Sequence, residues 1–134
     1  MLIVRPVADP ESAEEICRLF GRTPDPDIMA YLAVDAEDPD DKDPAPLVLC
    51  RFTLKGGKNE IVTIDRFDGT NDTEALIITA RTVMSFMYRC AVKTVFASDD
   101  VPEDDALLLG FKRTDGKPFI NLEEFYKSPC HYEG

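Results

Sequence analysis

Cysteine and histidine are the residue types in this chain with the widest range of chemistry. The four cysteines lie far apart and form no C-x-x-C pair, so their spacing favours neither a metal site nor a redox pair. Cys17, Cys50 and Cys90 fall within apolar patterns, and we expect them to be reduced and buried. Cys130 precedes His131, the only histidine, but the sequence fixes no third ligand beside them. We therefore predict no metal site.

Carboxylates form two clusters in the sequence. The formal net charge is −11, from 26 Asp and Glu against 15 Lys and Arg. Such a charge repels nucleic acid and anionic membranes unless a basic patch intervenes, and the sequence contains no such patch. We expect two solvated loops, although the same carboxylates could attract a cationic amine substrate. The clusters are Asp35, Glu37, Asp38, Asp40, Asp41 and Asp43, and then Asp99, Asp100, Glu103, Asp104 and Asp105.

Length and hydropathy predict a single domain over residues 1–134. A chain of this size buries roughly two-thirds of its unfolded surface on folding, which is enough for a core. No apolar run approaches the roughly 20 residues that span a bilayer, and residues 1–7 are too short and too lightly charged for a signal peptide. We expect a cytoplasmic protein with neither a membrane nor a nucleic-acid partner, and we leave open whether it forms a homodimer.

Hydrophobic patterning predicts strands in the first half of the chain, with one helix among them. The helix has acidic residues near its start, which suit the positive end of the helix dipole, and an apolar stripe that runs to Gly21. Alternation in the third strand indicates one better-buried face. Residues 28–36, which we predict as the second strand, also contain residue types that favour a helix. The predicted elements are strands over 2–7, 28–36, 47–55 and 61–67, a helix capped by Asp9 or Ser12, and a hairpin turn over 56–59.

A long helix dominates the second half. It is predicted over residues 72–91, with Asp72 or Thr73 as its cap, because apolar residues recur at steps of four and three. A short helix follows, with Pro102 at its first position and Gly110 at its end. The strands on either side of the long helix should be parallel. The stripe comprises Leu76, Ala80, Val83, Met87 and Cys90, and the remaining predicted strands cover 93–97, 111–114 and 119–126.

Three segments follow one another along the chain: Ile3-Val4-Arg5-Pro6 with the helix after it, the Gly56 hairpin with the strand and long helix that follow, and Leu109-Gly110-Phe111 before the last strands. Taken in this order, they resemble the GNAT acetyltransferase superfamily across nearly the whole chain. The resemblance implies an α/β (α+β) domain with a mixed, mainly antiparallel sheet and helices on both faces. The short link over residues 21–27 implies that a second helix, present in many members before the second strand, is missing here.

The resemblance also implies acetyl-CoA as the cofactor. In that family the turn before the long helix reads Gln/Arg-x-x-Gly-x-Gly/Ala, and its backbone amides bind the coenzyme A diphosphate. Arg66, Gly69 and Asn71 fit this spacing, with Asn at the last position. Asp68 and Asp72 place negative charge there, so an ordinary capped loop is the alternative. The implied cofactor-binding residues are Arg66, Gly69, Thr70, Asn71 and Thr73.

Two catalytic roles follow from the same resemblance. Members often place a tyrosine four residues before the glycine of the Leu-Gly-Phe segment, as the acid that protonates the leaving thiolate, and Ala106 stands there in this chain. Glu60 and Asp65 are the implied general bases for the attacking amine. The predicted function is acyl-CoA-dependent N-acyl transfer to an amine of unknown identity. The alternative is a non-catalytic GNAT-like module that acts through protein or small-ligand binding. The substitutes for the missing acid are Ser98, Tyr88, Tyr126, Cys130 and Tyr132.

Overall fold

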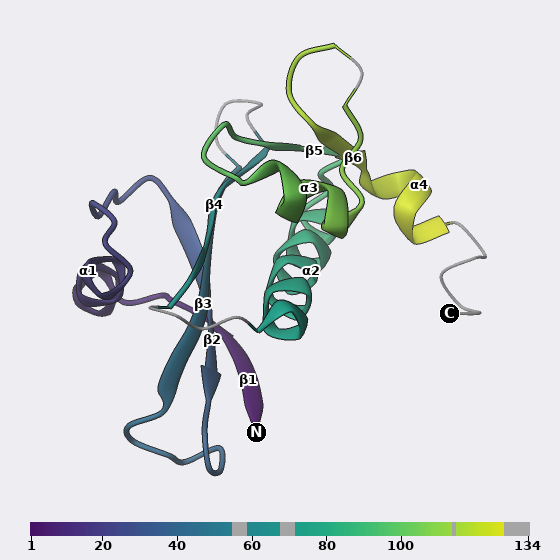
Figure 1. Cartoon of the computed structure of the whole chain (residues 1–134). Coiled ribbons are helices and arrows are strands. Elements are labelled where there is room, and N and C mark those ends of the chain that lie inside the picture. Colours follow the sequence, from purple (N-terminus) through teal and green to yellow (C-terminus); the bar gives the residue numbers. More distant parts are fainter. Residues whose placement is uncertain (55–58, 68–71, 114, 128–134) are drawn as a thin grey trace.

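The computed structural model describes residues 1–54, 59–67, 72–113 and 115–127 (Figure 1). Six strands form one sheet in the order β1-β2-β3-β4-β5-β6. The predicted hairpin turn and the Cys130–His131 pair lie wholly or largely outside these residues. The strands are β1 (Leu2–Pro6), β2 (Met29–Asp35), β3 (Ala45–Thr53), β4 (Glu60–Arg66), β5 (Thr94–Ala97) and β6 (Phe119–Asn121). The helices are α1 (Pro10–Leu19), α2 (Thr73–Arg89), α3 (Glu103–Leu109) and α4 (Leu122–Lys127).

The sheet is mixed and mainly antiparallel, as predicted. The pairs β1–β2, β2–β3, β3–β4 and β5–β6 are antiparallel, and β4–β5 is parallel. α2 connects the two parallel strands, because a parallel pair needs a crossover rather than a tight turn. The predicted parallel pairing on either side of the long helix is therefore confirmed. No helix among the described residues is long and apolar enough to cross a membrane.

The helices cover both faces of the sheet. Figure 1 shows α1 on one side of the strands and α2 with α3 on the other. The main core lies between α2 and the sheet, where the predicted helix stripe packs against Val48, Cys50 and Phe52 of β3. Cys90 was predicted to extend this stripe, but it is exposed. The helix ends at Arg89, and Ala91 takes a φ of 67°, so the chain turns away from the core at that point.

Side-chain caps fix where the two longer helices begin. Asp9 accepts a hydrogen bond from the Ser12 amide at 3.1 Å, and Asp72 accepts one from the Ala75 amide at 2.9 Å. These contacts satisfy amides that have no partner within the helix. Gly110 ends α3 with a φ of 98°, a left-handed conformation that glycine adopts without strain. Pro102 precedes α3 as its N-cap, so its predicted place at the first helical position was one residue out.

The two strands predicted near the end of the described chain were largely wrong. Lys112 forms only an isolated bridge with Phe119, and β6 stops at Asn121. The Asn121 side chain then accepts a hydrogen bond from the Glu124 amide at 3.1 Å, which starts α4 instead of extending the strand. The helix brings Tyr126 onto Tyr88 of α2, with ring centroids 4.7 Å apart. The spacing of the aromatic residues over 119–126 predicted a strand, but the packing of Tyr126 against α2 favours a helix here.

Candidate functional site

β4 and β5 separate soon after they meet. They pair only at Glu60↔Phe96 and Ile61↔Ala97, and among the described residues the rest of β4 has no strand partner on that side. The register of β4 against β3 shifts here, since Phe52 pairs with Ile61 and Arg51 with Thr63, which leaves Val62 as an extra residue. Ser98 lies where the strands diverge, and its hydroxyl donates a hydrogen bond to the Val62 carbonyl at 2.5 Å.

The two predicted general bases are engaged in ion pairs at opposite ends of β4. Glu60 accepts a hydrogen bond from Lys117 Nζ at 2.5 Å. Asp65 accepts two from Arg22, at 2.8 and 2.9 Å. These contacts raise the pKa of both cations, chiefly through the hydrogen bonds themselves. Protonating either carboxylate would break its ion pair, and the structure does not bring Glu60 and Asp65 together in one site.

Arg66, the predicted anchor for coenzyme A, is also engaged in an ion pair. Its two terminal nitrogens donate to the Asp105 carboxylate of α3 at 3.0 and 3.1 Å. The side chain of Asp105 is 8% exposed and that of Arg66 is 27% exposed. The Arg66 Nε atom is buried and has no hydrogen-bond partner among the described residues. Of the other predicted cofactor ligands, Gly69, Thr70 and Asn71 lie outside the described residues, and Thr73 is the exposed first residue of α2.

The described part of this turn does not fit a diphosphate group. Asp72 occupies an amide at the start of α2 and puts a carboxylate where an anion would bind. Asp105 neutralises the guanidinium of Arg66, and two more acids, Glu103 and Asp104, stand in the first turn of α3. Ala106 is buried and offers no proton. Beside the described residues of this turn a diphosphate would meet like charge, and both the Arg66 guanidinium and the Ala75 amide are already engaged.

The architecture can be compared with solved structures. A candidate acetyltransferase from Exiguobacterium sp. 255-15 aligns with a TM-score of 0.63 at 10% identity, covering 96% of this chain and 99% of that chain. A chain of the KacTA–DNA complex gives a TM-score of 0.63 at 12% identity and covers 100% of both chains. This chain has the GNAT fold. At such identities the likeness concerns the fold alone.

Other comparisons add little to the GNAT-fold assignment. YhhK from E. coli, a candidate N-acetyltransferase solved with coenzyme A bound, aligns with a TM-score of 0.47 at 16% identity, over 90% of this chain and 97% of that chain. This score is too low to support an argument about the present chain. No protein-family model matches the sequence, and no curated protein matches it significantly.

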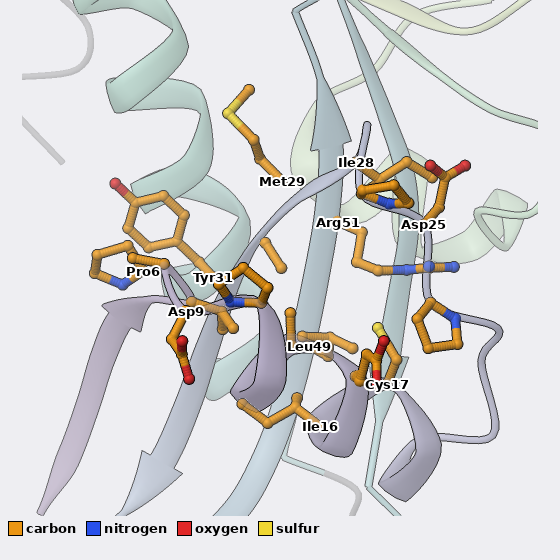
Figure 2. Close-up of a pocket in the computed structure, with 18 of the residues that line it drawn as sticks. Pro6, Asp9, Ile16, Cys17, Asp25, Ile28, Met29, Tyr31, Leu49 and Arg51 are labelled. Carbon is orange, nitrogen blue, oxygen red and sulfur yellow. The ribbon is translucent and has the colours of Figure 1, made fainter.

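A cavity of about 600 Å³ opens on the α1 side of this GNAT fold (Figure 2). It lies between α1, the loop over residues 20–28 and the first residues of β2. The described residues that line it include none from β4 or β5, so it is separate from the place where those strands diverge. Its apolar walls include Val7, Ile16, Ile28, Met29, Leu49 and Phe52, and its charged residues are Asp9, Glu14, Asp25 and Arg51.

Arg51 is the charged residue that the sequence analysis missed. It lies within the apolar run of β3, is 6% exposed and lines the cavity. Its Nε donates to Thr63 Oγ1 at 2.9 Å, and its Nη1 donates to the Thr23 carbonyl at 3.3 Å. Leu49 is buried on the same strand, so the prediction of one better-buried face was wrong for β3. An arginine inside an apolar strand was the sequence signal that could have identified this position.

Proposed function

We propose that this chain is a GNAT-fold binding protein that does not use coenzyme A at the turn before α2. The observation that supports this proposal is the bidentate ion pair between Arg66 of β4 and Asp105 of α3. Arg66 is the last residue of β4, so an acyl donor held at this turn with its thioester beside β4 would lie close to the ion pair. Opening this ion pair would lose its stabilising interaction and would leave the nearly buried Asp105 carboxylate beside a diphosphate. The lost ion pair and the like-charge repulsion would both oppose binding.

Calorimetric titration with coenzyme A and acetyl-CoA tests the proposal. We expect the wild-type protein to show no saturable binding at millimolar concentration. The double variant Asp72→Gly, Asp105→Asn should gain measurable affinity, because it frees an amide of α2 and removes the carboxylate that neutralises Arg66.

Asp9→Gly is the matched control for that titration. It removes the same kind of N-cap carboxylate from α1, away from the turn, and should gain nothing. Micromolar binding of acetyl-CoA by the wild-type protein, together with turnover on any amine, would contradict the proposal.

N-acyl transfer from acetyl-CoA to an amine is the second candidate. The observation that favours it is the divergence of β4 from β5 beyond Ile61, which leaves one side of β4 without a strand partner among the described residues. Backbone amides at such a place can polarise a carbonyl group. The net charge of −11 would suit a cationic amine as the acceptor. Release of free thiol from acetyl-CoA in the presence of polyamines or lysine peptides would measure this activity directly.

A further inference from the structure

We infer that the cavity beside α1 binds a small apolar molecule with a single carboxylate, and that Arg51 binds the carboxylate. This inference goes beyond the proposed function and does not depend on whether coenzyme A binds. The described lining residues include none from β4 or β5, although Arg51 donates a hydrogen bond to Thr63 of β4.

The first argument is that Arg51 has no counter-ion among the residues that the structure describes. The residue is 6% exposed, yet its hydrogen bonds go to a threonine hydroxyl and a backbone carbonyl, both neutral. No carboxylate among the described residues lies within 4.0 Å of it, and Asp65, two residues beyond Thr63 on β4, is already paired with Arg22. Burying a cation without a counter-ion costs free energy, because no ion pair compensates for the lost hydration.

The second argument is the geometry of the arginine side chain. A guanidinium has five N–H donors in a planar fork, and the two described hydrogen bonds of Arg51 leave donors free. This planar fork matches the two oxygens of a carboxylate better than it matches a ligand with a single acceptor atom. Figure 2 shows Arg51 extending from β3 towards the loop that carries Asp25, next to Leu49 on the same strand. An anion in the cavity would therefore complete the coordination of Arg51.

The third argument is the apolar wall around this one cation. The volume of about 600 Å³ lies within the range of pockets that take up small organic molecules. Ile16 and Cys17 of α1 approach Leu49 of β3 from one side, and Ile28 and Met29 lie on the other (Figure 2). Filling this space with hydrocarbon would remove apolar surface from water, which stabilises the complex by roughly 25 cal/mol per Å².

The carboxylates at the rim exclude more highly charged ligands. Asp9, Glu14 and Asp25 line the cavity and are exposed. They would repel phosphorylated molecules more strongly than a monocarboxylate, whose one charge can reach the buried arginine. The site therefore favours an apolar monocarboxylate over a nucleotide or a sugar phosphate.

Paired titrations with octanoate and octanamide test the inference, since the two probes differ in charge and share a hydrocarbon chain. We expect calorimetry on the wild-type protein to show saturable octanoate binding, roughly tenfold or more tighter than octanamide, the size of one charge-assisted contact. NMR shifts should concentrate on the methyl groups of Ile16, Ile28 and Met29. Arg51→Gln should bring the two dissociation constants together, and Arg51→Lys should keep part of the preference.

Asp25→Asn is the matched control at the rim. It keeps an oxygen that can accept the Asp27 amide hydrogen bond, and it removes one like charge. Octanoate should bind this variant at least as tightly as it binds the wild-type protein. A weaker complex would mean that the rim, and not Arg51, recognises the ligand.

Several outcomes would overturn the inference. Equal affinity of the wild-type protein for both probes would remove the role of the carboxylate, and no binding of either would remove the site. If Arg51→Gln does not fold, as judged by circular dichroism, Ala13→Trp replaces it, because Ala13 lines the cavity from α1 without contacting Arg51 through any described hydrogen bond. Ala13→Trp should abolish binding of both probes, and unchanged octanoate binding by this variant would refute the site.

Discussion

At the scale of single residues, three charged residues of β4 form ion pairs with distant parts of the chain. Glu60, Asp65 and Arg66 bind partners that lie 57, 43 and 39 positions away in the sequence. No local pattern encodes such pairs, so sequence analysis assigned these three residues roles in catalysis and cofactor binding. Their contacts show that each also ties β4 to another element, namely the loop before β6, the loop after α1, and α3.

The Arg66–Asp105 pair should contribute measurably to stability. Arg66→Met would leave Asp105 nearly buried without a counter-ion, and we expect the free energy of unfolding to fall by about 2–3 kcal/mol, below the usual cost because Arg66 is partly exposed. Adding Asp105→Leu should restore much of the loss. Urea denaturation measures both values. Arg18→Met is the control, because its pair with Glu14 is exposed and should be worth less than about 0.5 kcal/mol. Equal losses from Arg18→Met and Arg66→Met would contradict the argument.

The buried thiol of Cys50 leads us to expect that the protein loses stability at alkaline pH. Complete burial raises the pKa of its thiol far above the ordinary value. The unfolded chain therefore loses this proton near pH 8.5 while the folded chain keeps it, so the contribution is fully present below that pH and falls as the pH rises. The expected slope from this one group is about 1.4 kcal/mol per pH unit.

Urea denaturation of the wild-type protein at pH 8 and pH 10 measures this loss. Cys50→Val should be less sensitive to alkali than the wild-type protein, since it lacks the titrating group. Cys90→Ala removes an exposed thiol and should keep the wild-type sensitivity. An identical pH dependence of Cys50→Val and wild type would exclude Cys50 as the cause.

At the scale of helices and strands, the sequence predicted most of the fold up to α3. Alternation, caps and the stripe on α2 are local signals, and they located β1 to β5 and the first three helices to within about three residues at each boundary. The sequence did not predict α4, because this helix depends on the packing of Tyr126 against Tyr88 of α2. These two residues are far apart in the sequence and meet only in the folded chain. The cavity was missed for the same reason, since Arg51 acquires its neighbours only when β3, the loop over 20–28 and β4 come together.

The cap of α2 gives a prediction at this scale. Asp72→Ala should lower the free energy of unfolding by about 1 kcal/mol, because the Ala75 amide loses its acceptor. Asp72→Gly should cost only a few tenths of a kcal/mol, because glycine is itself a favoured N-cap residue. Thermal unfolding followed by circular dichroism would rank the two variants. The reverse ranking would show that Asp72 stabilises α2 by another route. The mild cost of glycine also makes Asp72→Gly suitable for the coenzyme A titration.

At the scale of the whole molecule, the sheet has two parts joined at a narrow place. β1 to β4 pair along most of their lengths, whereas β5 and β6 connect to them through two residue pairs between β4 and β5. The second part is held further by α2, α3 and Leu122, which is fully buried and donates its amide hydrogen bond to the Lys93 carbonyl at 2.7 Å. Proteins often open in such contiguous units before they unfold completely.

Hydrogen exchange should therefore resolve two units. Val48→Ala weakens the core beneath β3, by about 2 kcal/mol, and should speed exchange in β2 and β3 while leaving β5 and β6 unchanged, because Val48 stays packed when only the second part opens. Leu122→Ala should speed exchange in both parts, since Leu122 is released in partial and in complete unfolding. Mass spectrometry of exchanged peptides separates the two patterns. Faster exchange of β5 and β6 in Val48→Ala would mean that the whole sheet opens as one unit, so that the narrow β4–β5 junction does not divide it.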